Sequence, residues 1–561
     1  MSPMQPAGVA GGLRPPGTVM RLARMGAMHP TRLSFLRAML RRAAREGWRI
    51  SRTAWALDPL GFGHALYTVQ MPERIYSLVA FSRHLPDAER TDRVIAEAWD
   101  TSYVLYDGVP DADEIARLAR NVPLQEAGRF AATDLILSRA NKSTRLFDSV
   151  VHTLAAGRQP DAAAIEDVGY LLRTTAVYGN GKFGIADRDR IAGRAEFAGP
   201  FQAEMLTVWL IRAFTIDLVE HCAAALSPGA AQIDPALRRR FGVGNSTGLG
   251  MAPFLVRHPI LLHHWMLARE TALSRVRALP AASPDTWAAF HAQLRAARSA
   301  SAHWLTADEL QSTRVCELAT DLAALARYVV TLPPDTPEPW EAIYRWAEDN
   351  LCLEAQECTV SLLIEPHGAR VDDLCETMSA NESTGTWIDG GIGCAALGTL
   401  IDAVYPWALA MDFGQPAAVA RFWYVSAEKL EPRLGERAEE PGAEREQPLT
   451  FARDVSRLRK ALALAPDAQP VAVFLLERPE FRHVVRRVQI AARFPYAEIQ
   501  DNLIDAEMRP IDLLRCKLAF FGATRFDPRS DRWLRICLFQ GAPFPCEMLA
   551  RPKTAAFGDA A

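Results

Sequence analysis

The chain lacks the features that mark several large protein classes. Its 561 residues include nine cysteines, and no two of them form a Cys-x-x-Cys pair. An odd and sparse set of cysteines is typical of reduced, mostly buried thiols rather than of a disulfide framework. No run of about 18 uninterrupted apolar residues occurs, so the sequence predicts no transmembrane helix. We therefore expect a cytoplasmic protein.

Motifs for the common cofactors are also missing. The central glycine-rich segment is not followed by the Lys-Ser/Thr pair of a P-loop, and its glycine spacing does not fit a Rossmann fingerprint. The 12 histidines form neither a His-Glu-x-x-His nor a His-x-His motif, and no grid of cysteine and histidine occurs. The sequence therefore contains no NAD, P-loop nucleotide or structural zinc motif, so the cofactor stays unknown and no metal ligand is assigned. A metal site on a helix is an open alternative, since His221 follows Asp217 and Glu220.

The composition is that of an ordinary folded protein. Hydrophobic residues make up 49% of the chain and charged residues 23%, so a large core can be buried, and the length allows two or three domains. The formal net charge of −3 produces no overall field that would attract nucleic acid or an anionic membrane.

Three segments mix glycine with Asn, Ser, Thr or Lys between long apolar stretches: residues 178–184, 242–250 and 379–393. Glycine lets a backbone approach a ligand closely, and the polar side chains supply hydrogen bonds. We expect the three segments to build one ligand pocket. The predicted substrate-binding residues are Asn180, Asn245, Ser246, Thr247, Gly248, Asn381, Ser383 and Thr384.

Four side chains in or near these segments are predicted to be catalytic. Lys182 could hold a carboxylate or phosphate, and Tyr178, His258 or Glu382 could transfer a proton. The segment 242–250 is predicted to be a loop before a helix, whose N-terminus favours an anion. Each segment is equally well explained as a structural turn between helices.

The fold expected from these patterns is α+β, a predominantly helical body with a mixed sheet built from N- and C-terminal strands. Residues 64–70 and 74–81 alternate in polarity and predict a hairpin. Helices are expected over most of residues 111–410, where Ala, Leu and Arg are dense. Further strands are expected after residue 412, from their aromatic and β-branched residues. These are 420–426, 470–475, 483–493 and 533–539, and one more short strand is expected at 102–106 in the N-terminal part.

Five regions follow from this organisation. Residues 1–30 are predicted to be a disordered leader, in which Met20, Met25 and Met28 are alternative starts. Residues 31–50 hold a basic amphipathic helix. The main α-rich domain with its N-terminal hairpin spans 51–429, a polar acidic loop spans 430–449, and a C-terminal α/β segment on the same core spans 450–561.

The leading hypothesis is an enzyme that acts on a small anionic metabolite, a carboxylate above all, by proton transfer of the lyase or isomerase type. Two alternatives remain. One is a non-catalytic scaffold or regulator that uses the helical body, in which a homo-oligomer is possible. The other is an RNA-associated protein that uses the arginines and aromatic residues of the C-terminal region, although acidic residues between them make nucleic acid the weaker partner.

Overall fold

The structure is a computed structural model of the chain, and it divides into two compact units. Unit 1 comprises Met1–His29, Gly248–Trp287 and Cys316–Ala519, and unit 2 comprises Pro30–Thr247, Ala288–Val315 and Phe520–Ala561. The residues that the structure describes are 12–86, 98–124, 130–174, 191, 193–248, 255, 258–304, 306–333, 335–379, 388–413, 422–426, 432–435, 443–448, 452–500, 510–524, 527–528 and 533–548.

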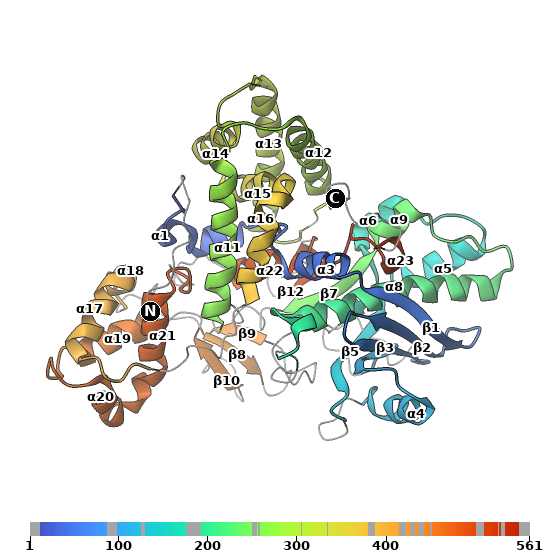
Figure 1. Cartoon of the computed structure of the whole chain (residues 1–561), viewed down its shortest axis with the longest axis horizontal. Helices are drawn as coiled ribbons and strands as arrows, with labels where there is room; N and C mark the ends of the chain where they lie inside the picture. Colours follow the sequence, from blue (N-terminus) through green and yellow to red (C-terminus); the bar gives the residue numbers. More distant parts are fainter. Residues whose placement is uncertain are drawn as a thin grey trace. The chain divides into compact units, whose positions relative to one another are not determined.

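Unit 2 is built on a mixed sheet. Within the described residues the sheet has nine strands in the order β1-β2-β3-β4-β5-β6-β7-β12-β11 (Figure 1). Neighbours from β1 to β6 are antiparallel, whereas β6 and β7 are parallel. The strands are β1 (Arg49–Leu57), β2 (Gly63–Gln70), β3 (Ile75–Ser82), β4 (Thr101–Asp107), β5 (Asp134–Lys142), β6 (Tyr170–Thr174), β7 (Gly242–Gly248), β11 (Asp527–Pro528) and β12 (Trp533–Leu538).

The predicted hairpin is confirmed by β2 and β3, which pair from Gly63 with Ser82 to Gln70 with Ile75. Its turn is closed by Met71 N–H, which donates to the Arg74 carbonyl at 2.9 Å. Seven of the eight residues of β3 are buried, because both faces of the sheet are covered.

Helices cover the two faces of this sheet. On one face lies α8 (Gln202–Leu226), whose Phe214 ring packs edge-on against Tyr103 of β4. On the other face α4 (Ala112–Asn121) buries Leu118 among Val79, Val104 and Leu137 of the sheet (Figure 1). The remaining helices of unit 2 are α3 (Phe35–Arg45), α5 (Phe147–Ala155), α6 (Ala162–Val168), α9 (Pro235–Arg240), α12 (Pro284–Ser301), α23 (Pro545–Met548) and the 3₁₀ helix Ala195–Phe197.

Unit 1 is mainly helical, and its centre is formed by α11 (Pro259–Arg277) and α15 (Leu353–Ile364). Both are buried on nearly all sides, as expected for helices inside a core. The other helices are α1 (Pro16–Val19), α2 (Leu22–Gly26), α13 (Glu309–Thr331), α14 (Pro339–Asn350), α16 (Gly368–Val371), α17 (Cys394–Val404), α18 (Pro406–Leu409), α19 (Ala452–Leu462), α20 (Val471–Glu477), α21 (Arg482–Arg493), α22 (Pro510–Phe521) and the 3₁₀ helices Glu365–His367, Asp372–Ser379 and Pro479–Phe481.

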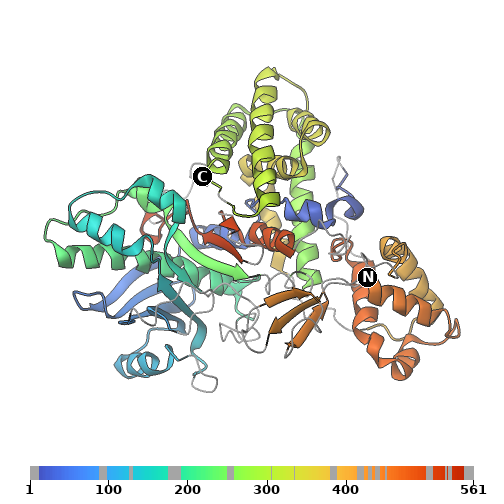
Figure 2. The same cartoon turned by 180° about the vertical axis from the view of Figure 1, so that it is seen from behind.

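A separate group of helices in unit 1 has its own core. Helices α17 to α21 bury an apolar cluster that includes Leu397, Ile401, Leu458, Phe474 and Val488 (Figure 1, Figure 2). Strands β8 (Phe422–Ser426), β9 (Pro432–Gly435) and β10 (Ala443–Pro448) form an antiparallel sheet in the order β10-β8-β9.

The fold is therefore α+β, largely helical, with a mixed sheet, as expected. The strands of the main sheet come mostly from the N-terminal part of the chain: six of the nine described ones lie within residues 49–174. The region 129–156 was predicted to be helical but contains β5, and 162–176 contains β6. Residues 430–448, predicted to be a loop, contain β9 and β10. The helix expected over 89–100 falls largely outside the described residues.

Two predicted strands are wrong. Residues 471–477 and 482–493 are helices α20 and α21. In α21 the buried Val484, Val485, Val488 and Ala491 recur at the spacing of one helix face. Burial of this face against α17 and α19 stabilises a helix despite the β-branched residues, whose strand preference depends on context.

The expected disorder of residues 1–30 is contradicted from Gly12 onward. Residues 16–19 and 22–26 form α1 and α2, and Val19, Met20 and Met25 are fully buried. Two arginines of this segment are buried with them: Arg14 is 5% exposed and Arg24 is 8% exposed. The prediction was wrong because it rested on the composition of the segment alone. A buried arginine is stable only when a carboxylate pairs with it, and the composition of the segment does not show a carboxylate that lies elsewhere in the fold.

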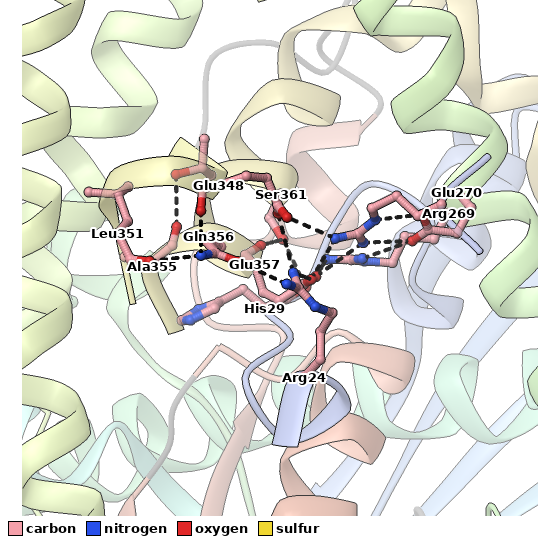
Figure 3. Close-up of polar contacts among 12 residues, drawn as sticks. Arg24, His29, Arg269, Glu270, Glu348, Leu351, Ala355, Gln356, Glu357 and Ser361 are labelled. Carbon is pink, nitrogen blue, oxygen red and sulfur yellow. Dashed lines mark hydrogen bonds and ion pairs between the residues drawn. The ribbon is translucent and has the colours of Figure 1, made fainter. Parts of the chain in front are cut away.

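The partners of these arginines lie on α11 and α15 (Figure 3). Arg14 forms a bidentate pair with Glu270, at 2.7 and 2.8 Å, and also donates to Glu357 at 2.7 Å. Glu357 in turn accepts from Arg24 at 2.9 Å and from Arg269 at 2.6 Å. Burial raises the pKa of Glu357, but the charges of Arg14, Arg269 and Arg24 outweigh it and hold the pKa well below its usual range.

A second buried group continues this network. His29 Nε2 lies 2.9 Å from Glu354 Oε1, and Arg515 of α22 also donates to Glu354. The Ser361 hydroxyl donates to the His29 carbonyl at 3.0 Å. These buried, charge-assisted hydrogen bonds hold the segment 12–29 against α11, α15 and α22 of unit 1.

Candidate functional site

The candidate site lies at the carboxyl ends of β6 and β7 in unit 2. These two strands are parallel neighbours, with Arg173 beside Gly244 and Thr174 beside Asn245. The chain therefore leaves both strands at the same edge of the sheet. Ligands of sheets with parallel strands bind beyond the carboxyl ends of those strands. Residues 242–248 of one glycine-rich segment form β7, whereas the segment 178–184, which follows β6 in the sequence, lies outside the described residues.

Arginines gather beside this edge. The register places Arg139 of β5 opposite Ser102, and Asn141 opposite Arg173. Residues that pair across a sheet point to the same face, and so do residues two apart in one strand. Arg139, Asn141 and Arg173 therefore share one face at the point where β6 ends.

A second arginine lies close to Arg139. Arg83, which follows β3, donates from Nε to the Trp99 carbonyl at 2.9 Å, and the Arg139 guanidinium lies 5.6 Å from the Trp99 ring centre. Burial lowers the pKa of Arg139, and the like charge of Arg83 lowers it further. The like charges of these two half-buried guanidinium groups favour the binding of an anion.

Buried polar groups hold the strand ends around these arginines. The hydroxyls of Ser138 and Thr174 are 2.8 Å apart, and Thr174 also donates to the Arg139 carbonyl at 3.1 Å. Asn141 Oδ1 accepts from Asp100 N–H, and Asp100 Oδ2 accepts from Lys142 N–H, both at 2.9 Å. These hydrogen bonds fix the backbone around Arg139. They thereby restrict the positions that its side chain can take.

The prediction of a loop over residues 242–250 is wrong for residues 242–248, which form β7. The first two glycines allow close packing of the sheet. A Cβ on Gly242 would lie 2.5 Å from the Leu538 carbonyl oxygen, and one on Gly244 would lie 2.4 Å from the Tyr170 ring. These glycines are explained by strand packing, without any ligand.

The predicted site residues fall into three groups. Asn245 is buried in β7, 1% exposed, at the candidate site. Ser246, Thr247 and Gly248 continue the same strand. His258 is half-buried and precedes the first turn of α11 in unit 1. The others lie outside the described residues: Tyr178, Asn180, Lys182, Asn381, Glu382, Ser383 and Thr384.

The described end of the third segment is a turn in unit 1. Asp389 Oδ1 accepts from Gly391 N–H at 3.0 Å, and its backbone exchanges hydrogen bonds with the Gln489 side chain at 2.8 and 3.0 Å. Asp389 therefore serves local structure here.

Sequence reasoning missed Arg139 as a site residue. Its place in β5 was predicted to be helical, so the pairing of Arg139 with Ser102 was invisible. Arg83 stood out only as the end of the hairpin. The alternation of Leu135, Leu137 and Arg139 on one face is the signal that could have found it.

His263 and His264 are adjacent residues of α11. His263 is buried, and its Nδ1 accepts from Tyr496 N–H at 3.1 Å. Burial, and secondly the neighbouring His264, lowers the pKa of His263 to about 3. His263 is thus a neutral core residue. Among the described residues no cluster of His, Cys, Asp and Glu is arranged to hold a metal ion.

The lowered pKa of His263 predicts a pH dependence of stability. In the unfolded chain a histidine has a pKa near 6.5. Below that pH the unfolded state binds a proton at this position, whereas the folded state does not. The contribution of His263 to the free energy of unfolding is therefore constant above pH 6.5. It decreases by about 1.4 kcal/mol per pH unit as the pH falls toward 3. Chemical denaturation between pH 7 and 4 should show this slope.

The variant His263→Asn keeps an acceptor for Tyr496 N–H but cannot be protonated, so we expect a shallower slope. The matched control His303→Asn alters an exposed histidine and should keep the wild-type slope. Identical slopes for His263→Asn and wild type would contradict this assignment.

The comparisons with known proteins give no identity. No protein-family model, no curated protein and no solved structure matches this chain. No helix of the described part of the chain is long and apolar enough to cross a membrane.

Proposed function

We propose that the chain is an enzyme that binds a small anionic metabolite, a carboxylate above all, at the carboxyl ends of β6 and β7. The observation that carries the proposal is the placement of Arg139 on β5 beside the end of β6, with the like charge of Arg83 acting on it. A guanidinium matches the two oxygens of a carboxylate with two parallel hydrogen bonds. The proposed reaction is a proton transfer of the lyase or isomerase type.

The sequence next to this edge supplies the remaining groups. Tyr178 and Lys182 follow Thr174 by four and eight residues, so both are close in sequence to the end of β6 and to Arg173. In the proposal the arginines and Lys182 hold the anion, Asn245 and Thr247 orient it, and Tyr178 transfers the proton.

The RNA-associated alternative receives less support from the described residues. Arg487 is buried and pairs with Glu498 at 2.6 Å, and Arg515 pairs with Glu354. Tyr496, Phe520 and Phe521 are buried as well. Side chains inside a core cannot stack on bases. These five residues therefore do not contribute to a basic and aromatic surface in the described C-terminal region.

A thermal-shift screen of carboxylates and phosphates tests the proposal first. A ligand at one hundred times its dissociation constant adds about 2.7 kcal/mol of stability. For any ligand found, Arg139→Ala is expected to raise the dissociation constant by about 10- to 100-fold. This is the usual contribution of one charge-assisted hydrogen-bonding group to affinity. Lys182→Ala should also weaken it, while the melting temperature stays within a few degrees.

The matched control is Arg120→Ala, which removes an exposed arginine of α4 in the same unit and should leave the dissociation constant unchanged. A ligand that binds Arg139→Ala and Lys182→Ala as tightly as wild type would exclude this site. A shift with RNA and with no small anion would favour the RNA-associated alternative.

A further inference from the structure

A cavity of about 800 Å³ opens in the helical group α17 to α21 of unit 1. Ligand pockets typically have volumes between about 300 and 1,000 Å³, so the space suits a small molecule. The cavity belongs to unit 1 alone and involves none of the residues assigned to the proposed enzyme site. It is lined by Ile388, Gly390, Ala472, Leu475, Pro479, Arg482, His483 and Arg486.

One wall of this cavity is apolar. Ile388, Leu475 and Pro479 line it, and Gly390 brings the Asp389 turn close to α20. A Cβ on Gly390 would lie 2.8 Å from the Ala472 Cβ, so glycine is needed for this approach. The apolar surface continues outward on α20, where Leu476 is 83% exposed.

The opposite wall is cationic. Arg482, His483 and Arg486 come from the first two turns of α21. Within the described part of the chain neither Arg482 nor Arg486 is engaged by a carboxylate. His483 lies 3.4 Å from Asp454 of α19, and this hydrogen bond raises the pKa of the imidazole. The positive end of the twelve-residue helix α21 adds to the same field.

Two carboxylates near this wall have hydrogen-bond partners of their own. Asp454 is the partner of His483, and Asp389 accepts from Gly391 N–H within its own turn. Two arginines on successive turns can hold a carboxylate or phosphate with paired hydrogen bonds. The apolar wall beside them then suits an attached hydrocarbon group.

We propose that this cavity is a second binding site, which takes an anionic amphiphile: a carboxylate or phosphate head that carries an alkyl or acyl chain. Arg482 and Arg486 bind the head, and Ile388, Leu475 and Pro479 cover the chain. The expected occupant is a single free amphiphile molecule, because the volume of the cavity is that of a site for one small molecule.

Titration calorimetry with octyl phosphate on the full chain tests this site. Each buried methylene strengthens binding about fourfold, so hexyl phosphate should bind up to about 15-fold more weakly than octyl phosphate. Octanol and inorganic phosphate should each bind at least tenfold more weakly, since each lacks one half of the recognised chemistry.

Three variants locate the site. Arg486→Ala should weaken octyl phosphate binding by tenfold or more. Ala472→Trp should abolish it by filling the cavity, because Ala472 is exposed and lines the cavity. Arg457→Ala, an exposed arginine of α19 outside the cavity, is the matched control and should bind as wild type does. Arg139→Ala should also bind octyl phosphate normally, which separates this site from the proposed enzyme site.

Several results would overturn the proposal. Octanol that binds as tightly as octyl phosphate would remove the role of the arginines, and inorganic phosphate that binds as tightly would remove the role of the apolar wall. Unchanged binding by both Arg486→Ala and Ala472→Trp would place the ligand elsewhere. Binding to phosphatidylglycerol vesicles without binding to octyl phosphate would identify a membrane surface as the occupant instead.

Discussion

Replacing Arg14 by methionine is expected to reduce the free energy of unfolding by about 3–5 kcal/mol. That is the usual cost of removing one partner from a buried ion pair. Arg14 is 5% exposed and is the bidentate partner of Glu270, which is itself 1% exposed. Methionine fills the space but leaves Glu270 and Glu357 in the core with less positive charge near them (Figure 3). Urea denaturation of both proteins at pH 7 measures the difference.

The matched control is Arg275→Met, which removes an exposed ion pair of the same unit, with Asp373 at 2.8 Å. An exposed pair is worth at most about 1 kcal/mol, so this variant should differ little from wild type. A chain that starts at Met20 lacks Arg14 and should be destabilised at least as much as Arg14→Met. Equal stabilities of the Arg14 and Arg275 variants would show that the buried network adds nothing.

Replacing Gly242 by alanine is expected to destabilise unit 2 by about 2–3 kcal/mol, the upper part of the range for overpacked cores. The new methyl group would lie 2.5 Å from the Leu538 carbonyl oxygen and 3.1 Å from the Gln540 nitrogen. Both are backbone atoms, so no side chain can rotate away, and β7 and β12 must move apart. The melting temperature of the variant gives the measurement.

Gly193→Ala is the matched control, because nothing lies within 4 Å of a Cβ at that position. A change at such a place should stay within about 0.5 kcal/mol. A Gly242→Ala protein as stable as Gly193→Ala would mean that the strands can separate without cost, and the structural role of Gly242 would be lost. Ligand affinity measured on the same variants distinguishes this role from direct participation in binding.

The local elements were the most predictable part of this fold. The β2–β3 hairpin has the alternation and the short turn that define such a pair, and α3 and α8 have the apolar patterns of helices. The errors occurred where two patterns compete. Residues 482–493 are rich in β-branched side chains yet form α21, since the helix buries Val484 and Val488 together. Residues 134–142 form a strand inside an apparently helical region, because β4 and β6 are available to pair with them.

The candidate site was predictable only in part. The glycine-rich segments were visible in the sequence, and residues 242–248 of one of them form β7, a parallel neighbour of β6. The arginines beside them were not visible as a group, because Arg83 and Arg139 are 56 positions apart in the sequence. Only the order β3-β4-β5-β6 brings these positions to one edge.

The sequence by itself determined the class of the fold, the hairpin and most of the helices, because these depend on periodicity and on neighbours within a few residues. The tertiary structure decided which charges are buried and which stay in water. Arg14 and Glu357 are 343 positions apart and give no local signal, yet they form one ion pair in the core of unit 1. A buried arginine is stable only beside its carboxylate, and which carboxylate lies beside it is a property of long-range packing alone.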